Sequence, residues 1–73
     1  MDFNIALFRQ RLREEREYHG WSQATLAKKS NLHPNVLWKL EHEDRPGMLV
    51  VTVVRLAKAL RVTTDYLLGL TDE

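Results

Sequence analysis

The stretch "GMLVVTVVRLAKAL" (residues 47–60) constrains the fold of this 73-residue chain more than any other. Its first half is rich in β-branched residues, which favour a strand, and its second half has the apolar spacing of an amphipathic helix. No other segment predicts a partner strand, and an isolated strand would leave its backbone groups unpaired. We therefore expect an extended lead-in, an N-cap at Thr52 and a helix over residues 53–60.

The same stretch contains more apolar residues than an extended lead-in requires. Val51 and Leu56 fall at the N′ and N4 positions of a hydrophobic staple if Thr52 is the cap, and Val50 and Val53 are candidate core residues. The remaining apolar side chains form a candidate dimer or partner surface. Its members are Met48, Leu49, Val51 and Leu70.

Four further helices are predicted by caps and apolar spacing. The expected N-caps are Asn4, Ser22, His33 and Thr63, with Pro34 at the first position of the third helix. The helices are expected over residues 5–19, 23–29, 34–41 and 64–68. The predicted fold is all-α, with five short helices in one compact domain over residues 1–73.

Length and composition exclude several classes of protein. The chain has no cysteine, so it has neither a disulfide nor a thiolate metal site. A core of this size supplies only about 3–5 kcal/mol, which favours dimerisation as an additional source of stability. No apolar run approaches the ~20 residues of a membrane helix, and the acidic second residue argues against a signal peptide. We expect a cytoplasmic protein with no membrane partner.

Charge and motifs favour binding over catalysis. Residues 3–40 contain seven basic and three acidic residues, whereas residues 41–73 contain four basic and six acidic residues. The excess of positive charge in the first half is compatible with a polyanionic partner or with an ordinary solvated surface. The segment "EHED" (residues 41–44) is best explained as a solvated helix end, and the three histidines lack metal-ligand spacing. We expect no enzyme activity, no metal, no cofactor and no small-molecule ligand.

Two predicted helices joined by a tight turn, over residues 23–41, have the spacing of a helix-turn-helix. The segments "GWSQATLAKKSNLHPNVLWKLE" and "RLAKALRVTTDYLLG" together resemble the Cro/repressor-type (lambda-repressor-like) helix-turn-helix family over most of the chain. The resemblance implies a homodimeric regulator of transcription that binds double-stranded DNA and inserts its third helix into the major groove of an operator.

The resemblance also implies roles for individual residues. Base contacts fall on Pro34, Asn35, Trp38 and Lys39. Asparagine can pair with adenine and lysine can donate to guanine, whereas proline offers only an apolar contact. Trp38 could instead pack over its own helix or contact a protein partner.

Phosphate contacts fall on Ser22, Gln23, His33 and Arg45. For His33, an ordinary cap is the simpler alternative. The acidic turn around Arg45, and an acidic residue at position 15 where relatives are usually apolar, depart from the family pattern.

Arg16 and Glu41 match an ion pair of the family, in which an arginine late in the first helix meets the acid that ends the third. Without a partner, an acid at a helix C-terminus would oppose the helix dipole, so we expect a partly buried, structural pair. The predicted function is a repressor or autoregulator. The alternative is a helix-turn-helix protein that acts mainly through protein contacts, of the antitoxin or anti-repressor type.

Overall fold

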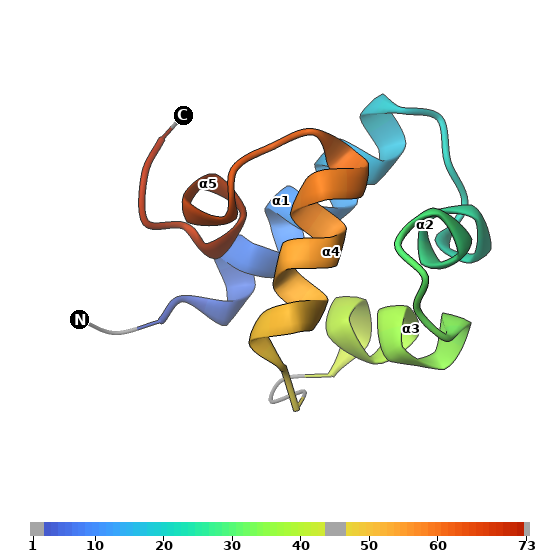
Figure 1. Cartoon of the computed structure of the whole chain (residues 1–73). Helices are drawn as coiled ribbons and strands as arrows, with labels where there is room; N and C mark the ends of the chain where they lie inside the picture. The colour runs from blue at the N-terminus through green and yellow to red at the C-terminus, as the bar shows by residue number, and fades with distance from the viewer. Residues whose placement is uncertain (1–2, 44–46, 73) are drawn as a thin grey trace.

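Five α-helices form the chain in the computed structural model, which describes residues 3–43 and 47–72. They are α1 (Ile5–Tyr18), α2 (Gln23–Lys29), α3 (Pro34–His42), α4 (Val50–Leu60) and α5 (Thr64–Leu68). No strand occurs within the described residues. In Figure 1, α4 crosses in front of α1, with α5 on one side and the α2–α3 pair on the other. No helix among the described residues has the length and apolar character needed to cross a membrane.

Side-chain caps explain where four of the helices begin. The Asn4 carboxamide accepts from the Leu7 N–H at 3.0 Å, and Phe3 packs against Phe8 with ring centroids 6.0 Å apart, as the staple predicts. Side chains of Ser22, His33 and Thr63 each accept from a backbone N–H in the first turn of the helix that follows. Satisfying these otherwise unpaired donors fixes the helix starts that the sequence predicts.

The fourth helix starts earlier than the sequence predicts. It begins at Val50 with Leu49 as a cap residue that makes no side-chain hydrogen bond, so Thr52 is not the N-cap and residues 50 and 51 are not extended. The Leu49 carbonyl accepts from the N–H groups of Thr52 and Val53, at 3.0 and 3.3 Å. Thr52 is only 7% exposed and lies on the buried stripe of the helix, so burial overrides its capping preference.

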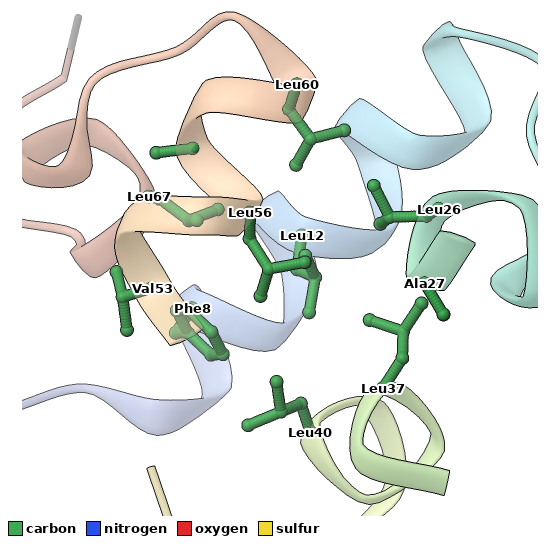
Figure 2. Packing of buried hydrophobic residues seen from close by; sticks show 11 residues of the cluster. Phe8, Leu12, Leu26, Ala27, Leu37, Leu40, Val53, Leu56, Leu60 and Leu67 are labelled. Carbon is green, nitrogen blue, oxygen red and sulfur yellow. The ribbon is translucent and has the colours of Figure 1, made fainter. Parts of the chain in front are cut away.

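One hydrophobic core joins all five helices. Its largest side chains converge between α1, α4 and the α2–α3 pair (Figure 2). The fully buried members are Phe8, Leu12, Leu26, Leu37, Leu40, Leu56, Leu60 and Leu67. The prediction that Val50 could join this core is wrong, because the extra helical turn directs it to solvent, where it is 82% exposed. The core holds α2 and α3 in a fixed relative orientation and leaves the outer face of α3 free.

Candidate nucleic-acid interface

The outer face of α3 carries the side chains that the core does not use. Leu37 and Leu40 are buried on the inner face. The four predicted base-contact residues, Pro34, Asn35, Trp38 and Lys39, are all exposed. Residues three and four apart on a helix are neighbours, so Asn35 lies beside both Trp38 and Lys39. Trp38 is 49% exposed, which leaves much of a large ring available for contact with another molecule.

His33 caps α3 through a specific ring nitrogen. Its Nδ1 accepts from the Asn35 N–H at 3.0 Å. An imidazole nitrogen that accepts a hydrogen bond carries no proton, so in the neutral ring the proton lies on Nε2. The cap accounts for a histidine at the start of this helix, and it leaves the Nε2–H of an exposed side chain available to an acceptor such as phosphate.

The start of α2 lies against this surface. The Ser22 hydroxyl accepts from the Thr25 N–H at 3.1 Å and donates to the Thr25 hydroxyl at 2.9 Å. The Gln23 Nε2 lies 3.3 Å from the Nε2 of His42 at the end of α3. Residues of both helices line a shallow groove, namely Gln23, Ala24, Pro34, Asn35 and Trp38. The structure therefore brings the predicted base-contact residue Trp38 and the predicted phosphate-contact residue Gln23 to one groove.

His42 is a member of this surface that is not among the residues predicted from the sequence. Its ring lies 4.7 Å from the Trp38 ring, centroid to centroid, at an interplanar angle of 31°. The i, i+4 spacing of Trp38 and His42 could have indicated this contact, whereas the contact with Gln23 depends on how α2 packs against α3. Arg45, the fourth predicted phosphate contact, lies outside the described residues.

Arg16 and Glu41 form the ion pair expected at the inner end of α3. The guanidinium donates to both carboxylate oxygens, from Nε at 2.9 Å and from NH2 at 3.0 Å, and its NH1 donates to the Trp21 carbonyl at 2.9 Å. The Glu41 side chain has no exposed surface and that of Arg16 is 13% exposed. Arg13 adds a second positive charge, with its Nε 3.7 Å from the carboxylate. This cluster fixes the end of α3 against α1.

The apolar run before and within α4 divides between a groove and open surface. Met48, Leu49 and Val50 line a groove with residues of α4 and α5, including Leu68. Leu49 is 69% exposed and Val51 is 49% exposed. Leu70, also 49% exposed, follows α5 and lies outside the described lining of this groove. Val50, a predicted core residue, is more exposed than any of them.

Known proteins share this arrangement of helices. A helix-turn-helix family model matches residues 12–67. The restriction-modification controller protein C.AhdI from Aeromonas hydrophila is 36% identical, over 86% of this chain and 94% of its own, with a TM-score of 0.77. No curated protein gives a significant match.

Two structures of SinR also share the fold. The N-terminal DNA-binding domain of SinR from Bacillus subtilis is 22% identical, with coverage of 85% and 90% and a TM-score of 0.79. A crystal structure of SinR, the master regulator for biofilm formation, in complex with DNA is 23% identical, with coverage of 84% and 97% and a TM-score of 0.77. At these identities the SinR structures support the fold alone. The family match over residues 12–67, together with the likeness to C.AhdI, shows that this chain belongs to the helix-turn-helix family.

Proposed function

We propose that this chain is a transcriptional regulator that binds a specific double-stranded DNA operator through α3. The observation that carries the proposal is the exposed face of α3, where Asn35, Trp38 and Lys39 stand on a helix whose opposite face is fixed in the core. A rigid helix with polar side chains on one face suits the B-DNA major groove, which admits a single helix. The name of C.AhdI, a controller protein, agrees with a regulatory role.

The base contacts follow from the chemistry of the exposed side chains. The Asn35 carboxamide has the donor and acceptor that adenine N7 and N6 require, and the Lys39 ammonium can donate to guanine O6 or N7. Pro34 can contact only an apolar group such as a thymine methyl. Trp38 offers a ring edge and its indole N–H to a base or sugar.

Phosphate contacts would hold α3 in register on the duplex. The Gln23 carboxamide and the Nε2–H of His33 are the available donors at the rim of α3. Ser22 can exchange the Thr25 hydroxyl for a phosphate oxygen without losing its cap, because the cap uses its oxygen as an acceptor. Arg45 is proposed from the sequence alone.

We also propose that the chain binds as a homodimer and acts as a repressor or autoregulator. Repression requires only that the operator be occupied, so it needs no surface beyond those described. Two recognition helices related by a twofold axis read half-sites about 34 Å apart. The exposed apolar residues at the start of α4, with Leu49 at their centre, are the proposed contact between subunits. In this arrangement burial in the dimer accounts for apolar side chains that a monomer would leave in water.

Selection from random duplex DNA, followed by affinity measurements across salt, tests the DNA-binding proposal. We expect one enriched operator, and an affinity that falls steeply between about 50 and 200 mM salt as counterions return to the duplex. Asn35→Ala and Lys39→Ala should each lower affinity for that operator by about tenfold or more. Lys58→Ala is the matched control, because Lys58 is an exposed cation in the last turn of α4, outside the α2–α3 pair. Unchanged affinity in both α3 variants would show that α3 does not read the operator.

Leu49→Asp tests the dimer. Leu49 is the uncapped N-cap of α4, and aspartate there should stabilise the monomer by about 1 kcal/mol through a side-chain cap. A charge on the contact surface should also dissociate the dimer. We expect light scattering to give twice the chain mass for the wild-type protein and the single chain mass for the variant. A variant that remains dimeric would exclude the start of α4 as the contact.

An alternative function is supported by the same exposed apolar run. If the protein acts mainly through protein contacts, as antitoxins and anti-repressors do, Leu49 and Val50 would bind a different chain. Selection would then enrich no duplex, and the wild-type protein would be a monomer by light scattering.

A further inference from the structure

His42 contacts two side chains of the proposed DNA-binding surface. Its ring lies against that of Trp38, one helical turn earlier on α3, at 4.7 Å between centroids and 31° between ring planes. Its Nε2 lies 3.3 Å from the Nε2 of Gln23, the first residue of α2. His42 is the last residue of α3 and is itself exposed, so the buried core does not depend on it. One imidazole therefore joins side chains from both helices of the helix-turn-helix.

The hydrogen-bonding chemistry leaves Gln23 able to bind a second partner. A carboxamide nitrogen carries two hydrogens. Gln23 donates one of them to the unprotonated Nε2 of His42, which places the imidazole proton on Nδ1. The second hydrogen and the carbonyl oxygen stay available at the groove that Gln23 and Trp38 line together. The contact with His42 thus sets the direction in which the second hydrogen points.

Order in these side chains matters because free side chains lose rotamer entropy when they bind. A glutamine loses up to about 1.5–2 kcal/mol on full immobilisation, and binding costs fall when a side chain already has its bound conformation. Trp38 is half exposed, so its ring is not held by the core alone. The imidazole of His42, 4.7 Å from the Trp38 ring between centroids, restricts that ring before DNA arrives.

We propose that His42 is a positioning residue for DNA recognition: it orients the Gln23 carboxamide toward phosphate and the Trp38 ring toward the groove, and acts through these two side chains. The inference rests on the proposed function for its effect on DNA affinity, whereas the restriction of Trp38 and Gln23 is a property of the free protein. The two parts are therefore measured separately.

The first measurement uses the free protein and follows Trp38. Trp21 also stacks on a histidine, His19, with centroids 4.3 Å apart, so a Trp21→Phe background isolates the Trp38 signal. His42→Ala should shift the emission to longer wavelength and raise the acrylamide quenching constant, whereas Lys58→Ala should do neither. If Trp21→Phe does not fold, nuclear Overhauser contacts between the Trp38 and His42 rings in the wild-type protein answer the same question. Absent contacts, or unchanged emission and quenching, would refute the positioning of Trp38.

The second measurement separates the two contacts by affinity for the selected operator. His42→Phe keeps a ring beside Trp38 but removes the nitrogen that Gln23 uses, and should weaken binding about fivefold, the worth of one hydrogen bond. His42→Gln has no ring but restores a hydrogen-bond partner for Gln23, so it should recover the affinity that His42→Phe loses through Gln23. His42→Ala removes both contacts and should weaken binding about tenfold. All three should unfold at the wild-type urea concentration within error, since the side chain is exposed.

A double-mutant cycle gives the decisive comparison. Gln23→Ala should weaken binding less in a His42→Phe background than in the wild-type protein, because Gln23 has already lost its orientation there. Equal losses in both backgrounds, with wild-type operator affinity intact, would overturn the inference and leave the proposed function standing. If the wild-type protein enriches no duplex, the proposed function fails, and the fluorescence of Trp38 still decides whether His42 orders the groove.

Discussion

Arg16→Ala should remove most of the stability of this domain. The substitution leaves the Glu41 carboxyl group, whose side chain has no exposed surface, without its bidentate partner, and breaking a buried pair in this way costs about 3–5 kcal/mol. Arg13, 3.7 Å away on a half-exposed side chain, supplies some compensating charge and favours the lower end of that range. The lost hydrogen bond to the Trp21 carbonyl adds about 1 kcal/mol. The sum, about 4 kcal/mol, is comparable with the whole stability of a domain this small.

Urea unfolding followed by far-ultraviolet circular dichroism measures the effect of Arg16→Ala. With a slope of about 1 kcal/mol per molar urea, the midpoint should fall by about 4 M, and the variant should be largely unfolded without urea. The double variant Arg16→Met with Glu41→Leu should regain most of the loss, because two apolar side chains leave no charge unpaired. Lys58→Ala is the exposed-cation control. A midpoint for Arg16→Ala equal to that of the control would refute the reasoning.

Three further substitutions test the backbone and the core by thermal unfolding. Gly69→Ala should destabilise the protein more than Gly20→Ala. Both glycines have positive φ, but a Cβ at Gly69 would lie 2.9 Å from the Leu7 side chain, whereas a Cβ at Gly20 would meet nothing within 4 Å. Equal losses of stability would contradict the predicted clash with Leu7. Arg61→Gly should stabilise the protein by up to about 1 kcal/mol, because Arg61 ends α4 at φ 60°, a left-handed conformation that is unfavourable for residues other than glycine. A lower melting temperature would show that the contacts of the Arg61 side chain outweigh this backbone strain. Ser30→Ala should stabilise the protein by about 1 kcal/mol, because the Ser30 hydroxyl is buried without a hydrogen-bond partner among the described residues. A clear loss of stability would show that this hydroxyl has a partner.

Local sequence signals predicted the helices whose starts depend on a single side chain. Asn4, Ser22 and Thr63 each accept from a backbone N–H in the next turn, as their residue types indicate. The start of α4 could not be predicted in this way, because Leu49 makes no cap and Thr52 is drawn inside by burial. A threonine presents both a capping hydroxyl and a β-branched apolar surface, and only the packed bundle decides which is used.

The candidate site also contains features that local sequence predicts and features that depend on how the helices pack. The position of Asn35 and Lys39 on one exposed face follows from helical spacing and from the buried Leu37 and Leu40 on the opposite face. The contact of His42 with Gln23 joins residues from two helices, so no local pattern contains it. Arg16 and Glu41 lie 25 positions apart, and only resemblance to a family suggested that they meet.

The hydrogen bonds of Arg16 have a consequence for how the protein opens. One guanidinium on α1 holds the carboxylate near the end of α3 and the carbonyl of Trp21, just before α2. Proteins open locally in cooperative units that share few buried contacts with the rest of the fold. Because this buried charge joins α1, the segment before α2 and α3, α3 is not a separate unit, and the amide hydrogens bonded within α3 should exchange only on global unfolding. A signal that controlled this protein would therefore act on exposed side chains or on the spacing of subunits, and could not work by releasing α3 alone.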